Sequence, residues 1–114
     1  MGACIFCRII RGEIRSPIVQ ESEHVLVISD IAPKAPIHYL ILPKKHIENM
    51  ASITTADKDI CWAMWDMAQR LSKDLPDQAF NVIVNNGAAA GQSVFHLHWH
   101  FIAGKNIYSS GFSL

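Results

Sequence analysis

Apolar residues follow two different spacings along the chain, one typical of strands and one typical of helices. Short β-branched or alternating runs predict strands over 18–20, 24–29, 37–42, 80–85 and 94–103. Prolines separate several of these runs, because proline cannot donate to a strand ladder. Two prolines break the chain between Asp30 and Pro36, and Pro43 ends the third run.

Helical spacing marks two further segments. A short helix is predicted within Ile5–Ile14, with Gly12 loosening its end, and a long helix between Thr55 and Leu75. The long helix carries one apolar stripe, made of Ile60, Met64, Met67, Ala68, Leu71 and Leu75. Thr54 and Asp57 resemble a capping signal at its start. Pro76 follows its end, since the residue before proline avoids the α region.

These elements predict an α+β fold with a mainly antiparallel sheet of about five strands per subunit, one long helix and one short helix. Trp62 and Trp65 lie partly off the apolar stripe of the long helix. We therefore expect a second face of this helix to be covered as well. Contact with a second copy of the chain in a homodimer is the simplest explanation.

Composition narrows the class of protein. The chain has 114 residues, half of them hydrophobic, and ten Lys and Arg balance ten Asp and Glu. We expect a single domain over 1–114, with an N-terminal segment over 1–12 and a C-terminal tail over 104–114. Disorder and basic nucleic-acid binding are excluded, since each needs a charge surplus. No apolar run is long enough to span a membrane, so we expect no membrane partner.

The cysteines and the N-terminus bear on the compartment. Three cysteines cannot all pair within one chain, and the first residues lack the basic and apolar regions of a signal peptide. A reducing compartment is therefore expected, with the cytoplasm as the default.

One predicted strand carries an unusual row of histidines. Side chains alternate along a strand, so His96, His98 and His100 are expected to project from one face, about 6.5–7 Å apart. Phe95, Leu97, Trp99 and Phe101 are expected to project from the other face and supply core. Packing alone does not explain the histidines, because large apolar residues would bury better.

Two chemistries suit such a row. Three histidines can hold a catalytic Zn²⁺ with water in the fourth position. Alternatively, one histidine is a nucleophile and its neighbours set its tautomer and move protons. The preceding loop favours the second reading, because Gly87, Gly91, Gln92 and Ser93 supply backbone N–H groups, an amide and a hydroxyl that suit a phosphate.

Four ordered blocks resemble the histidine-triad (HIT) superfamily, in its Hint branch. His96-Leu-His-Trp-His-Phe-Ile fits the triad signature, and Gly91-Gln-Ser-Val precedes it as in the family. The segments from Asp30 to His38 and from Leu42 to His46 resemble the earlier blocks, and Phe6 to Ile14 resembles the first one. The resemblance runs to about residue 103 and implies a HIT-like fold.

The resemblance implies a hydrolase of purine nucleoside 5′-phosphoramidates that forms a covalent nucleotidyl-histidine. It implies His98 as the nucleophile, with His100, His38 and Ser93 as the other catalytic residues. The implied nucleotide-binding residues are Asp30 for the ribose, Asn85, Gly91, Gln92 and Val94 for the phosphate, and Ile5, Phe6, Ile9, Ile28 and Ile31 for the purine. No cofactor is implied for catalysis.

A second group of residues suggests a structural metal. Cys4 and Cys7 have the spacing of zinc ligands, although a tetrahedral site needs four. Some microbial relatives complete such a site with residues that match His46 and His96. The resemblance thus implies a possible structural zinc that joins the N-terminus to the catalytic strand.

Other functions remain open from the sequence. Dinucleoside polyphosphate hydrolysis uses the same chemistry with a phosphate leaving group, and a nucleotide-binding regulatory module would keep the pocket with little catalysis. The tail departs from the family, in which an aromatic or proline-rich segment shapes leaving-group preference. Tyr108 and Phe112 are candidates for that role.

Overall fold

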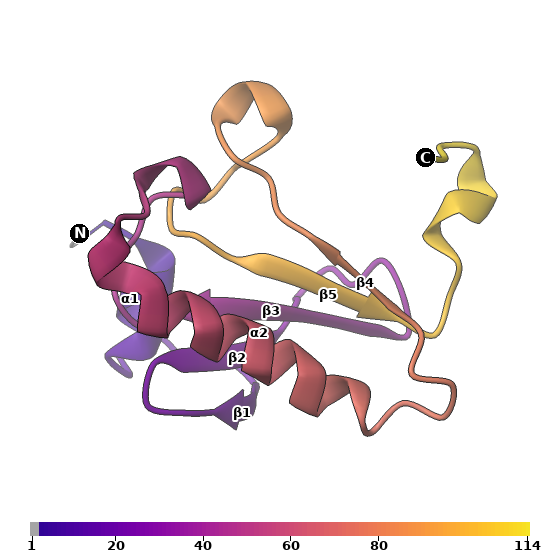
Figure 1. Cartoon of the computed structure of the whole chain (residues 1–114), viewed down its shortest axis with the longest axis horizontal. Coiled ribbons are helices and arrows are strands. Elements are labelled where there is room, and N and C mark those ends of the chain that lie inside the picture. The colour runs from indigo at the N-terminus through magenta and orange to yellow at the C-terminus, as the bar shows by residue number, and fades with distance from the viewer. Residues whose placement is uncertain (1–2) are drawn as a thin grey trace.

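The computed structural model describes residues 3–114, and Met1 and Gly2 of the predicted N-terminal segment lie outside the described residues. Figure 1 shows a twisted sheet crossed on one face by a long helix. The strands are β1 (Ile18–Glu21), β2 (Val25–Ser29), β3 (Ile37–Pro43), β4 (Phe80–Ile83) and β5 (Trp99–Ala103). The helices are α1 (Ile5–Ile10) and α2 (Lys58–Ser72). The strand order is β1-β2-β3-β5-β4 with every pairing antiparallel, which confirms the predicted fold class.

The central strands of the sheet are buried on both faces because they are apolar at most positions, whereas the edge strands β1 and β4 are mostly exposed. On one face, α2 packs against the residues Val25, Val27, Ile41, Phe101 and Ala103. On the other face, Phe6 of α1 packs against the residues Leu26, Ile28, Leu40 and Leu42. Strand alternation therefore sorts side chains into an α2 layer and an α1 layer.

The long helix confirms its predicted stripe, since Met64, Met67, Ala68 and Leu71 are buried. A 3-10 turn over Thr55–Asp57 precedes the helix, so α2 itself begins at Lys58. The buried Asp57 carboxylate accepts hydrogen bonds from the Thr54 backbone N–H at 3.1 Å and from Lys45 Nζ at 2.6 Å. The hydrogen bond from Lys45 holds the pKa of Asp57 below its usual value.

The predicted last strand is wrong in its first half. β5 begins at Trp99, because the Leu97 N–H donates to Ile47 O at 2.6 Å and thus to a loop. Phe95 is 45% exposed and supplies no core, whereas Leu97 and Phe101 are buried. The first helix ends at Ile10, within the predicted segment and just before Gly12.

The C-terminal tail leaves β5 at the end of the sheet away from α1 (Figure 1). Its 3-10 turn over Ile107–Ser110 places Tyr108 against Phe112, with ring centroids 6.1 Å apart. Leu114 is fully exposed. Among the described residues, no helix has both the length and the apolarity to cross a membrane.

Candidate functional site

Two histidines meet on the α1 side of the sheet because of strand register. His100 on β5 lies opposite Leu40, and His38 on β3 lies opposite Ile102, so the two histidines are diagonal neighbours. His38 Nε2 lies 2.9 Å from His100 Nδ1 and 3.4 Å from Asp30 Oδ2. These three residues come from two strands and the loop between β2 and β3.

A backbone amide sets the tautomers of this pair. The Lys34 N–H donates to His38 Nδ1 at 3.1 Å, so the proton of His38 lies on Nε2. That Nε2–H donates to His100 Nδ1, which leaves the proton of His100 on its own Nε2. Burial lowers the pKa of His100, and the neighbouring His98 and His38 lower it further, so this ring is neutral at pH 7.

His98 has the opposite tautomer. Its Nδ1 lies 2.7 Å from the carbonyl oxygen of His96, which can only accept, so Nδ1 carries the proton. Its Nε2 therefore carries a lone pair. Phe6 packs edge-on against the ring at a centroid distance of 5.0 Å, and the His100 ring lies 5.2 Å away. A buried imidazole with a fixed lone pair is suited to nucleophilic attack.

The loop before the histidines brings two of the expected phosphate residues, Ser93 and Val94, near α1. Gly91 has φ +98°, a conformation that favours glycine, and its Cα faces the Asn85 side chain. Ser93 is exposed and Val94 is half-buried. Together with Ile5, both line a cavity of about 380 Å³. Gln92 is buried, and its amide bonds only to other parts of the chain.

The residues expected to hold a purine are only partly brought together. Phe6 and Ile28 belong to the buried α1 layer, and Ile9 packs against it. Ile5 is half-exposed, and Ile31 is 94% exposed. Asp30, expected at the ribose, keeps one oxygen toward His38, while its other oxygen accepts from the Ala32 N–H at 2.8 Å.

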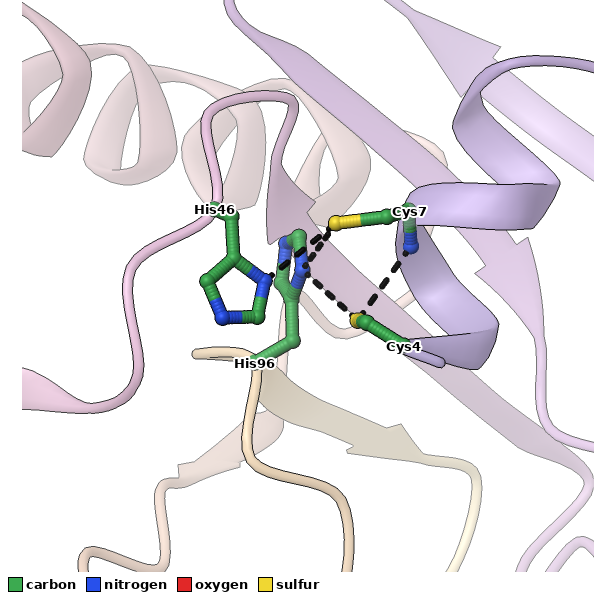
Figure 2. Close-up of side chains that lie close together, drawn as sticks. All are labelled: Cys4, Cys7, His46 and His96. Carbon is green, nitrogen blue, oxygen red and sulfur yellow. Dashed lines mark hydrogen bonds between the residues drawn. The ribbon is translucent and has the colours of Figure 1, made fainter. Parts of the chain in front are cut away.

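Cys4, which caps the start of α1, and Cys7 within α1 meet two histidines from distant segments. Figure 2 shows His96 between His46 and the two thiols. His96 Nδ1 lies 3.4 Å from Cys4 Sγ and 3.6 Å from Cys7 Sγ, and His46 Nδ1 lies 3.2 Å from Cys7 Sγ. All four ligand atoms lie within 4.8 Å of one another.

The chemistry of this cluster fits a tetrahedral cation. His96 Nε2–H donates to Pro43 O at 2.8 Å, so the lone pair on Nδ1 faces the sulfurs. Zn–S and Zn–N bond lengths at a tetrahedral angle give S···N edges of about 3.6 Å, close to the observed separations. Burial raises the pKa of Cys7, so a bound cation would be needed to keep its thiol deprotonated.

The three triad histidines do not share one metal site. Within residues 3–114, His96 belongs to the cysteine cluster, whereas His100 groups with Asp30 and His38. His98 belongs to neither cluster. The three triad histidines thus lie on the α1 side of the sheet, but they belong to different groups of side chains. This arrangement disfavours a Zn²⁺ ion held by the three histidines together.

Burial of His96 predicts a loss of stability in mild acid. Desolvation lowers the pKa of His96 to about 4, whereas an unfolded histidine titrates near 6.5. The unfolded chain therefore takes up the proton first, and stability falls as the pH falls below 6.5. Between pH 7 and pH 5, the titration of this ring is expected to lower the free energy of unfolding of the metal-free protein by about 2 kcal/mol. Urea unfolding with a chelator present measures this change.

Two variants separate His96 from other titrating groups. His24→Gln removes a half-buried histidine outside the cysteine cluster and should keep the full difference in stability between pH 7 and pH 5. His96→Gln should reduce the difference. An equal reduction in both variants would contradict the assignment.

The sequence did not indicate several groups that shape the site. The carbonyls of Pro43 and His96 and the N–H of Lys34 fix three ring tautomers, and backbone groups leave no pattern of residue types. Asn49 and Asn86 hold the loop before the histidines through their side chains.

Comparison with known proteins gives consistent matches over almost the whole chain. The family model described as HIT domain matches residues 11–107. An uncharacterized HIT-like protein of Synechocystis is 40% identical over 103 residues, covering 89% of this chain and 90% of its own. An uncharacterized HIT-like protein of Chlamydia trachomatis is 42% identical over 101 residues, covering 88% and 91%.

Solved structures agree with these matches. A HIT family hydrolase from Clostridium thermocellum has a TM-score of 0.89 at 39% identity, covering 94% of this chain and 95% of its own. A histidine triad protein from Clostridium difficile has a TM-score of 0.85 at 40% identity, covering 91% and 92%.

Proposed function

Because this chain belongs to the HIT domain family, we propose that it is a hydrolase that cleaves purine nucleoside 5′-phosphoramidates, as in the Hint branch. The observation that carries the proposal is the tautomer of His98. Its Nδ1–H is held by the His96 carbonyl, so Nε2 presents a lone pair beside His100. A neutral imidazole of this tautomer is a competent nucleophile at neutral pH.

The reaction proceeds in two steps. His98 Nε2 bonds to the α-phosphorus, and the P–N bond breaks with its electron pair on nitrogen. That nitrogen takes up a proton from solvent, while the His100 Nε2–H donates a hydrogen bond to a phosphoryl oxygen and stabilises the charge there. Water then attacks the phosphorus, the bond to His98 breaks, and the nucleoside monophosphate leaves.

The surrounding residues hold the substrate and stabilise its charge. Ser93 and the Val94 N–H, with Asn85 nearby, bind the phosphate, where positioned donors supply a large part of catalysis. Asp30 accepts hydrogen bonds from the ribose hydroxyls. His38 orients His100 through the 2.9 Å contact. Ile5, Phe6, Ile9, Ile28 and Ile31 form the purine slot.

Cys4, Cys7, His46 and His96 would hold a structural zinc ion, which would tie α1 and the loop after β3 to the segment before β5. Such an ion would affect catalysis only through position, because the carbonyl of His96 is the group that orients His98.

A homodimer covers the outer face of α2 and β4. β4 is an edge strand, and Met50, Trp65, Val82 and Trp99 line an apolar cavity of about 380 Å³ beside it. Trp65 is 64% exposed, an apolar area that a second copy would remove from water.

Two valines on opposite edge strands test the dimer. Val82 on β4 and Val19 on β1 are 39% and 37% exposed. Because only β4 lies in the proposed interface, Val82→Lys is expected to dissociate the dimer at micromolar concentration, while Val19→Lys leaves it intact. Size-exclusion chromatography with light scattering measures both, and a monomeric parent protein would contradict the proposal.

Single-turnover release of AMP from a fluorogenic adenosine 5′-phosphoramidate tests the function. Release within seconds supports a hydrolase, whereas binding without release would indicate a regulatory nucleotide-binding module. Faster cleavage of a dinucleoside polyphosphate would assign that substrate class instead. Turnover is expected to persist in a chelator added at assay time, which a metal-dependent hydrolase would not show.

A further inference from the structure

The side chain of Gln92 lies buried in the middle of the loop that precedes the histidines. Only 4% of the residue is exposed, although glutamine is usually a surface residue. Resting on the proposed function, we propose that Gln92 is a positioning residue, whose amide shapes the loop so that Ser93 and the Val94 N–H meet the phosphate.

Every polar position of the Gln92 amide is occupied by the protein itself. Oε1 accepts from the Gly87 N–H at 2.8 Å and from Asn49 Nδ2 at 3.3 Å. Nε2 donates to Glu48 O at 2.8 Å and to Val94 O at 3.0 Å. A glutamine amide has two donors and two acceptor lone pairs. This amide therefore has no free position for a nucleotide, and any effect on the ligand must act through other groups.

These bonds close the loop at both of its ends. Gly87 and Gln92 are joined twice, because the Gln92 backbone N–H also donates to Gly87 O at 3.1 Å. Gly87 has φ +91°, so the chain turns sharply there. At the other end the bond to Val94 O fixes the orientation of the residue that follows Ser93. This bond fixes the peptide group that follows Val94, and the Gln92 backbone bond to Gly87 O fixes the chain before Ser93, so the amide restrains the backbone on both sides of the Val94 N–H without touching the ligand.

The same amide fixes the loop against a second part of the chain. Glu48 and Asn49 follow His46 of the cysteine cluster, and Met50 N–H donates to Asn86 Oδ1 at 2.8 Å. The Leu97 N–H donates to Ile47 O in the same segment. Gln92 is therefore the buried centre of a set of bonds that seats residues 86–97 on residues 47–50.

Gln92→Met tests the proposal without changing charge. Methionine is similar in length but leaves the Gly87 N–H and the carbonyls of Glu48 and Val94 without partners. The Kd for AMP is expected to rise about tenfold or more, while the Kd for adenosine, which lacks a phosphate, changes less than about twofold. Isothermal titration calorimetry measures both constants at a temperature where thermal melting shows the variant folded.

Two further variants keep the test decisive. Gln78→Met makes the same replacement at an exposed turn and should leave both constants unchanged. Asn49→Ser removes one donor to Gln92 while serine still caps the following turn. This variant should raise the Kd for AMP by about threefold, in the same direction as Gln92→Met. Asn49→Ser decides the question if Gln92→Met does not fold.

The ratio of the two dissociation constants separates the outcomes. An equal rise for AMP and adenosine, or no rise in either, would overturn the positioning role. Failure of the proposed function looks different, because the parent protein itself would then release no AMP from the phosphoramidate, whatever the ratio of the two constants in the variants.

Discussion

Replacing His98 with alanine is expected to reduce phosphoramidate turnover by on the order of 10⁴-fold or more. The replacement removes the Nε2 lone pair that is proposed to attack the phosphorus, so the covalent step cannot occur at this residue. Binding of AMP should stay within about threefold of the parent protein, because the loop donors and the purine slot remain. Stopped-flow release of a fluorogenic amine and calorimetric titration with AMP measure the two effects.

A second histidine provides the control. His24→Ala changes a half-buried ring in the turn between β1 and β2, outside the candidate site, and should leave turnover unaltered. If His98→Ala retained a tenth of the parent rate, the nucleophile would have to be another group. A loss of AMP binding as large as the loss of turnover would mean that His98→Ala had disrupted the binding site. The loss of turnover would then not identify His98 as the nucleophile.

Removing the cysteine pair is expected to have the second-largest effect. Cys4→Ser with Cys7→Ser should abolish binding of the proposed zinc ion and lower the free energy of unfolding by about 4 kcal/mol in the presence of saturating zinc. The physical reason is that the ion binds only the folded state, in which α1, His46 and His96 come together. Elemental analysis of the purified protein and thermal unfolding with and without chelator measure the loss.

The third cysteine is the matched control. Cys61 lies on α2, outside the cluster, so Cys61→Ser should retain the metal and respond to chelator like the parent protein. Equal stability of the parent protein in zinc and in chelator would contradict the structural role. Turnover in the double variant should also fall, since the His96 carbonyl that orients His98 would lose its support.

The fold was largely readable from the sequence because its strands and its long helix bury clear apolar patterns. The stripe that includes Met64 and Leu71 is one helical period repeated, and it packs as predicted. The error at Val94–His98 has a different origin. The residue types alternate there as in a strand, but the Leu97 N–H donates to Ile47 O in a distant loop. Such a tertiary hydrogen bond cannot be inferred from the local sequence.

The site was predictable in residue types but not in geometry. Neither strand alone shows that His38 will lie diagonal to His100, since this depends on the register between β3 and β5. The tautomers depend on backbone groups, including the Pro43 carbonyl. The division of the triad between two clusters follows from α1 bringing its thiols to His96, a contact across 92 residues of sequence.

The central claim is that His98 forms a bond to phosphorus during turnover. The most direct test mixes the protein with an adenosine phosphoramidate and quenches the reaction rapidly in alkaline denaturant, because a phosphorus–nitrogen bond on histidine is hydrolysed in acid. Mass spectrometry of the peptides, kept at alkaline pH until measurement, then locates the adduct. We predict an adenylyl group on the peptide that contains His98, appearing before AMP and absent in His98→Ala. AMP released in the first turnover with no such adduct at any time, or an adduct on another residue, would contradict the account.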